Sequence, residues 1–170
     1  MSEKWVEVKE ILSGLIGDLT ISVTVLKEYE DQAYIHKPEY KIKRQAIWRL
    51  CVYSMVINCC KFLELNKKYG AIFKDLIPEH NDIRGKQVEK IKNNTAITKL
   101  RNSCVAHVNN KAKYLTENEV QNEIISMFNG TDAVEFLNWI YPDNVDEIDK
   151  TSYLVGVIEL LRDSISKKLQ

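Results

Sequence analysis

Apolar residues recur at intervals of three and four along most of this chain, and this periodicity constrains the fold more than any other feature. Leu12, Leu15 and Leu19 illustrate the spacing, which places apolar side chains on one face of a helix. No segment alternates apolar and polar residues at a period of two, which is the pattern of a half-buried strand. Only 6 Gly and 3 Pro occur among 170 residues, so few positions interrupt a helix. The sequence therefore predicts an all-α fold.

Breaks between the apolar runs divide the chain into about five to six helices, which we expect to pack as an antiparallel bundle. Gly70 is expected to end the second helix, Asp82 to cap the third, and Thr116 with Glu119 to form the capping box of the fourth. No repeat, low-complexity tract or linker divides the chain, so residues 1–170 are predicted to form one domain. The predicted helices cover residues 5–26, 47–70, 82–108, 116–130, 133–141 and 153–165.

The segment from Arg101 to His107 carries the strongest chemical signal in the chain. In this segment Asn102 directly follows Arg101. His107 comes six residues after Arg101 and is directly preceded by Ala106. Arg is a permanent cation whose planar fork fits a phosphate group, and His exchanges a proton near neutral pH. These two groups are sufficient to cleave RNA without a metal ion.

Arg101, Asn102 and His107 together resemble the motif of the HEPN superfamily of helical domains: Arg, a polar residue, then His four to six positions later. The resemblance is to HEPN proteins of abortive-infection and toxin–antitoxin type, which act in antiviral defence. It implies a metal-independent endoribonuclease whose site is shared across a homodimer. The resemblance does not extend to the Tyr that some of these toxins carry two positions after the His, where this chain has Asn109.

In a straight helix, residues six positions apart point about 120° away from each other, so Arg101 and His107 do not stack directly. Three arrangements remain open: the helix ends near Asn109, the Arg side chain reaches around, or each residue meets its counterpart from a second protomer. The resemblance implies the third. In the expected reaction His107 removes a proton from the ribose 2′-OH, Arg101 stabilises charge on the phosphate, and Asn102 orients one of them.

The net charge of zero hides an uneven distribution. Residues 84–113 hold eight cations and one anion, whereas residues 114–149 hold nine acids and no Lys or Arg. The basic stripe suits a polyanion such as RNA, although a solvated helix face that the acidic segment neutralises gives the same pattern. On the first interpretation the RNA-binding residues are Lys92, Lys99, Lys111 and Lys113.

Other sequence features exclude several kinds of site. The four Cys residues (51, 59, 60 and 104) lie in apolar contexts without ligand spacing, so we expect buried thiols, no metal and no cofactor.

The charged N-terminus does not resemble a signal peptide, and the apolar run from Leu50 to Cys60 is short for a bilayer. We therefore expect a cytoplasmic chain without membrane association.

A second function remains open beside the ribonuclease. A non-catalytic, HEPN-like helical module that binds a nucleotide or a protein, such as an antitoxin or a regulatory partner, has the same fold. The zero net charge favours this module, because RNA binding usually needs an excess of cations. The expected partners are therefore a second copy of the chain, RNA, and a cognate antitoxin or regulatory protein.

Overall fold

The computed structural model describes residues 2–105, 115–128 and 133–170, and these residues form helices and turns without any strand. The all-α prediction is confirmed. The described ranges contain seven α-helices, with short 3₁₀ turns between several of them and a π-helical segment at Arg101–Val105. The helices are α1 (Ser2–Glu30), α2 (Lys41–Leu76), α3 (Asn81–Asn93), α4 (Thr95–Leu100), α5 (Glu117–Met127), α6 (Ala133–Ile140) and α7 (Leu154–Leu169).

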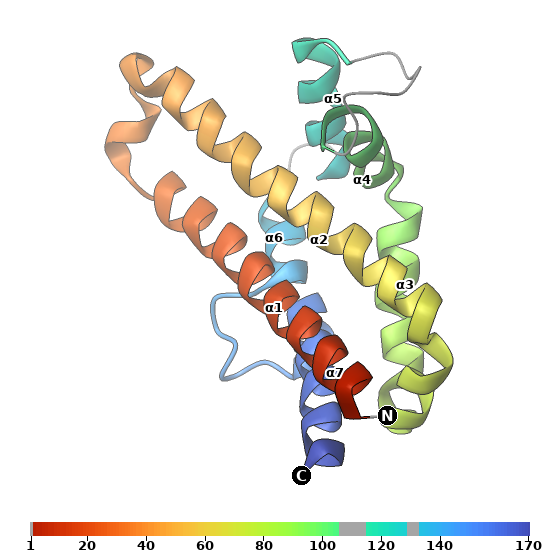
Figure 1. Cartoon of the computed structure of the whole chain (residues 1–170). Helices are drawn as coiled ribbons and strands as arrows, with labels where there is room; N and C mark the ends of the chain where they lie inside the picture. The colour runs from red at the N-terminus through yellow and green to blue at the C-terminus, as the bar shows by residue number, and fades with distance from the viewer. Residues whose placement is uncertain (1, 106–114, 129–132) are drawn as a thin grey trace.

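The long helices α1 and α2 form an antiparallel hairpin, and α7 packs along α1. Figure 1 shows α3 beside the second half of α2, and both chain termini at the same end of the molecule. The core lies between these helices, where Leu12, Leu19, Phe62 and Leu161 are completely buried. The apolar periodicity of the sequence thus becomes the contact surface of the bundle.

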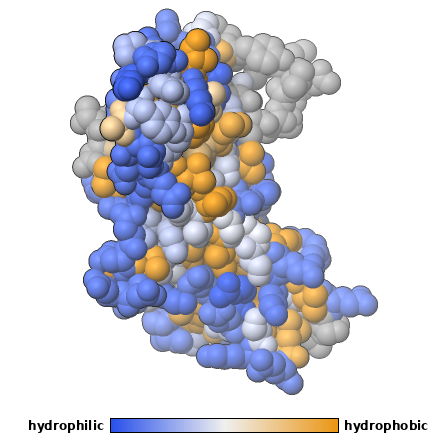
Figure 2. Space-filling model, turned by 90° about the vertical axis from the view of Figure 1, so that its left-hand side faces the viewer, coloured by the Kyte–Doolittle hydropathy of each residue, from blue (hydrophilic) through white to orange (hydrophobic). Residues whose placement is uncertain are grey.

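Surface apolar residues on α1 do not merge into a broad face. Ile21 is 57% exposed and Val25 is 37% exposed. Figure 2 shows the apolar residues of the hairpin side in small patches separated by polar ones. Patches of this kind are ordinary on a folded protein.

The prediction that Gly70 ends the second helix is wrong, because α2 continues to Leu76. Phe73 and Leu76 are buried, so the helix continues to bury its apolar face after Gly70. At Gly70 an added Cβ would lie 3.8 Å from Arg84 Nη1, which is ordinary contact. The helix ends at Leu76, and Ile77 caps it directly before Pro78, whose ring does not continue a helix.

The third predicted helix is interrupted at Asn94, where α3 ends and α4 begins. The Asn94 side-chain amide donates to the carbonyl of Met127 at 2.8 Å, and Met127 is the last residue of α5. The Asn94 backbone N–H still donates to the carbonyls of Lys90 and Ile91, so the side-chain contact adds a link between the helix break and the end of α5. The break raises the number of helices above the five to six that the sequence predicted.

The capping box predicted at Thr116 is present: the Glu119 N–H donates to Thr116 Oγ1 at 3.3 Å, and the Thr116 N–H donates to Glu119 Oε2 at 2.7 Å. We expect Thr116→Ala to lower the free energy of unfolding by about 1 kcal/mol, because a backbone N–H loses its partner. Chemical denaturation measures this change. Thr116→Ser keeps the hydroxyl and serves as the control. Equal stability of the Ala and Ser variants would contradict the role of the cap.

The segment Pro38–Leu76, which contains α2, is long and apolar enough by length and composition to cross a membrane, and it is the only such helix among the described residues. It is longer than the apolar run seen in the sequence. Its Val52, Met55 and Val56 side chains are completely buried in the core of the bundle, as expected for a central helix. The absence of membrane association stays a prediction.

Candidate functional site

Arg101 is the first residue of the π-helical segment that follows α4, and its side chain lies at the surface. Its Nη2 donates to Glu64 Oε1 of α2, and the Arg and Glu side chains are 41% and 60% exposed. An ion pair this exposed contributes at most about 1 kcal/mol to stability. Among the described residues, the hydrogen bond of the Arg101 guanidinium is the one that Nη2 donates to Glu64.

The other motif residues are described only in part. Asn102 is exposed and lies directly beside Arg101 in the π-helical segment. His107 lies outside the described residues, as do the predicted RNA-binding residues Lys111 and Lys113. The structure thus brings Arg101 and Asn102 together at the surface. A π-helical turn is rare and is often associated with functional sites.

A groove of about 480 Å³ lies between α2 and α3, next to the Arg101–Glu64 ion pair. Arg84 lies in its wall, half-buried, and donates to Asn66 Oδ1 and, at 2.8 Å, to Asn81 Oδ1. Its Nε is buried without a hydrogen-bond partner, and burial lowers the pKa of the guanidinium. The groove is lined by Leu63, Glu64, Asn66, Lys67, Gly70, Arg84, Gly85, Val88 and Lys92.

Arg84 therefore carries a charge that no described carboxylate compensates. A partly buried cation without a counterion is costly, and an anion that enters the groove would offset that cost. Lys67 borders the same groove and forms no ion pair with a described residue. Sequence reasoning placed Arg84 in the basic stripe but did not find Lys67, because α2 and α3 meet only in the folded chain.

Two of the predicted RNA-binding lysines are neutralised by neighbouring acids. Lys92 pairs with Glu89 at 2.9 Å, and Lys99 pairs with Glu123 at 3.0 Å. Glu123 belongs to the acidic segment, so for Lys99 the structure agrees with the alternative interpretation of the basic stripe. Lys99 remains 61% exposed, and its ammonium group stays accessible to solvent.

The described cysteines behave as apolar core residues. Cys51, Cys59 and Cys60 are buried free thiols, and burial raises the pKa of all three. For Cys60 the charge of Arg101 acts in the opposite direction but does not reverse the shift. Within the described ranges no group of three or more His, Cys, Asp or Glu residues is placed to hold a metal ion.

A second and larger cavity, of about 630 Å³, lies between α2 and α5. Trp48 lines this cavity, which the sequence analysis did not predict. The available signal was a run of cations at Lys37, Lys41, Arg44 and Arg49 around that Trp. The run was not recognised because the opposite wall comes from α5, far away in the sequence.

Comparison with solved structures finds an integron cassette protein, Vpc_cass2, from the mobile metagenome of V. paracholerae. The two chains are 63% identical, the match covers 98% of each, and the TM-score is 0.89. No family model matches the chain, and no curated protein matches it.

Proposed function

We propose, from the motif of Arg101, Asn102 and His107, that this chain, which belongs to the family of the integron cassette protein Vpc_cass2, is a metal-independent endoribonuclease of defence or toxin type. Arg101, Asn102 and His107 form the proposed site.

The observation that carries the proposal is the position of Arg101. Its guanidinium is half-exposed at the start of a π-helical turn, beside the groove that Arg84 and Lys67 border. Three cations from three segments of the chain thus lie around one surface region. On this proposal one phosphate group of an RNA strand contacts the Arg101 guanidinium, and the neighbouring phosphates follow the groove.

The proposed reaction uses the nucleophile that RNA itself carries. The neutral imidazole of His107 takes the proton of the 2′-OH, and the 2′-oxygen forms a bond to the adjacent phosphorus. Arg101 stabilises the negative charge on the non-bridging oxygens. The bond from phosphorus to the 5′-oxygen then breaks, and this oxygen takes a proton from the protonated His107 imidazolium of a second protomer. The products are a 2′,3′-cyclic phosphate and a free 5′-OH.

We expect the chain to cleave an RNA oligonucleotide in EDTA and to leave the DNA oligonucleotide of the same sequence intact, since DNA has no 2′-OH. Gel electrophoresis measures the cleavage, and mass spectrometry identifies the cyclic phosphate. His107→Ala is expected to abolish the reaction, while His80→Ala, which removes an imidazole outside the motif, is the matched control. Loss of activity in EDTA with recovery in magnesium would overturn the mechanism.

A non-catalytic binding module is the second candidate, and the ion pairs favour it. Arg101, Lys92 and Lys99 each already contact a Glu side chain, which reduces their attraction for phosphate. In the gel electrophoresis assay, a binding module that contacts RNA slows the migration of the intact oligonucleotide. A module that binds another partner leaves the migration of the RNA unchanged. The two candidates are therefore separated by the product analysis alone.

A further inference from the structure

The cavity between α2 and α5 is separate from the groove beside Arg101, and the two share no lining residue. We propose that it binds a small organic anion with an apolar body, such as an aromatic carboxylate or sulfonate. The proposal does not depend on the ribonuclease. The cavity is lined by Ile35, His36, Lys37, Pro38, Lys41, Arg44, Gln45, Trp48, Arg49, Gln121, Ile124, Ile125, Phe128 and Ala133.

The apolar part of the cavity comes from both of its walls. Trp48 belongs to α2. On the opposite wall, Ile124 and Ile125 belong to α5, and Phe128 is the residue that follows α5. The Trp48 and Phe128 rings meet edge to face, with their centroids 5.7 Å apart. Ile125 is 45% exposed, so apolar surface faces the opening. A volume of about 630 Å³ is within the usual range for sites that hold a small molecule.

A hydrogen-bond network fixes the α2 wall. Glu30 Oε1 accepts from Trp48 Nε1 at 2.6 Å and from Arg44 Nε at 2.8 Å. Burial would raise the pKa of Glu30, but the hydrogen bonds from Arg44 and Trp48 and the charge of Arg44 lower it overall. The carboxylate is therefore ionised at neutral pH and holds both side chains in place. A preformed wall reduces the entropy that a ligand loses on binding.

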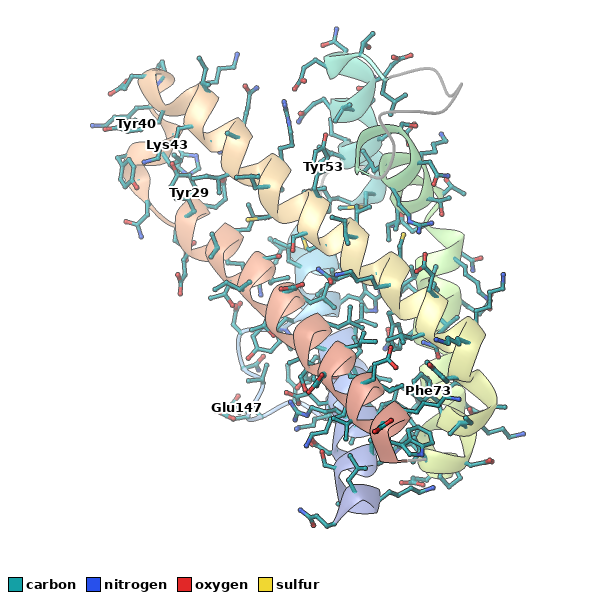
Figure 3. All side chains as sticks on the ribbon, in the orientation of Figure 1. Tyr29, Tyr40, Lys43, Tyr53, Phe73 and Glu147 are labelled. Carbon is teal, nitrogen blue, oxygen red and sulfur yellow. The ribbon has the colours of Figure 1, made fainter. Side chains whose placement is uncertain are left out.

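The turn that carries His36 and Lys37 is also anchored. Tyr29, Tyr34 and Tyr40 pack edge to face at the end of the α1–α2 hairpin, with centroid distances of 6.4 Å and 5.0 Å between successive rings. Figure 3 shows Tyr29, Tyr40 and Lys43 gathered there, and Lys43 Nζ lies 5.9 Å from the Tyr29 ring centroid. The cluster holds the turn against α2, so Lys37 is presented from a defined position.

The charge of the cavity selects the ligand. Four cations line it, Lys37, Lys41, Arg44 and Arg49, and the lining contains no acid. Arg44 pairs with Glu30 and Arg49 with Glu117, whereas Lys37 and Lys41 form no ion pair with a described residue. Two exposed ammonium groups without an ion pair to a described residue thus line a cavity that also has apolar walls. A ligand with one acidic group and an apolar body pairs its charge with the ammonium groups and packs its body against the apolar walls.

Two fluorescent probes with the same aromatic body test the proposal. 8-Anilinonaphthalene-1-sulfonate carries one negative charge, and N-phenyl-1-naphthylamine is its neutral parent. We expect saturable binding of the sulfonate to one site per chain, at least about tenfold tighter than binding of the neutral probe. A charge-assisted contact of about 1.4 kcal/mol or more gives this ratio. Fluorescence titration of the folded full chain measures both dissociation constants.

Variants then locate the site. The double variant Lys37→Gln, Lys41→Gln is expected to weaken the sulfonate about tenfold and leave the neutral probe unchanged, and Ile125→Asn is expected to weaken both. The control Lys61→Gln, Lys74→Gln makes the same charge change at exposed positions of α2 outside the cavity. Equal affinity for the two probes, or an equal loss in the control variant, would overturn the proposal. Circular dichroism verifies that each variant is folded.

An RNA oligonucleotide provides the last comparison. We expect RNA not to displace the sulfonate, because the cavity and the groove beside Arg101 are lined by different residues. Competitive displacement would assign the cavity to a nucleic acid and would overturn the small-molecule proposal. Failure of RNA cleavage leaves this result unaffected, so the two proposals fail independently.

Discussion

Arg101→Ala is expected to lower the rate of RNA cleavage by about 100-fold or more while the chain stays folded. Removing one group that stabilises the developing charge of a transition state commonly costs a factor of this size. The loss of stability should be small, because the ion pair that Arg101 makes with Glu64 is exposed on both sides. Single-turnover cleavage of a labelled RNA oligonucleotide measures the rate, and thermal denaturation measures the stability.

Two further substitutions separate a role in cleavage from a role in the ion pair. Arg101→Lys keeps the charge but loses the two-pronged contact with phosphate, so we expect it to be nearly as inactive as Arg101→Ala. Glu64→Gln breaks the same ion pair from the other side and should retain most of the activity. Lys74→Gln, at an exposed position of α2, is the control for charge. If Glu64→Gln and Arg101→Ala lose activity equally, Arg101 has only a structural role.

A site shared between protomers adds a distinctive result. A mixture of Arg101→Ala and His107→Ala protomers is expected to recover part of the cleavage activity, because a mixed dimer keeps one Arg101 and one His107 base. The mixed dimer lacks the second imidazole that protonates the 5′-oxygen, so we expect its rate to stay below that of the unmodified dimer. Light scattering at micromolar concentration gives the oligomeric state directly. A stable monomer with full activity would exclude the shared site.

The largest effect on stability is expected from Gly156→Ala in α7. A Cβ at this position would lie 2.2 Å from the carbonyl oxygen of Lys150 and 2.7 Å from its Cα. The backbone of Lys150 has little room to move, since Asp149 Oδ1 accepts from the Thr151 N–H at 2.8 Å and Lys150 Nζ pairs with Glu159 at 2.7 Å. Overpacking of this kind costs about 3 kcal/mol, which corresponds to a fall of roughly 10 °C in Tm.

Gly14→Ala is the matched control for this substitution. Gly14 lies in the interior of α1, is exposed, and has no heavy atom within 4 Å of an added Cβ. The same chemical change is therefore expected to raise the free energy of unfolding by up to about 1 kcal/mol, because Ala favours a helix more than Gly does. Calorimetry on both variants compares them. A destabilised Gly14→Ala variant would show that the α1 surface is packed against something else.

The sequence was sufficient for most of the fold, and the failures have physical causes. The periodic apolar runs predicted α1, α6 and α7 well, and the capping box at Thr116 identified the start of α5. Gly70 favours a helix end, but the cost of Gly within a helix is small compared with the free energy gained by burying Phe73 and Leu76. At the break between α3 and α4, Asn94 donates to the carbonyl of Met127, a partner that no local sequence pattern shows.

The candidate sites depend even more on tertiary structure. The sequence identified Arg101 and Asn102 as a motif but did not predict the ion pair with Glu64 or the groove beside it. Local spacing also suggested a basic stripe, whereas Lys99 is neutralised by Glu123 from another helix. The cavity between α2 and α5 combines residues from distant parts of the chain, so periodicity in either helix alone predicted only a buried face.

The packing of the first helix against the last has a consequence for how this chain folds. Many small helical bundles place sequence neighbours side by side, so their contact order is low and they fold in microseconds to milliseconds. Here the apolar face of α1, including Leu12 and Leu19, completes its core contacts with α7. Closing so long a loop carries an entropic cost before any of that burial is gained. We therefore expect a higher folding barrier than in a sequential bundle, with α1 and α7 docking late and together.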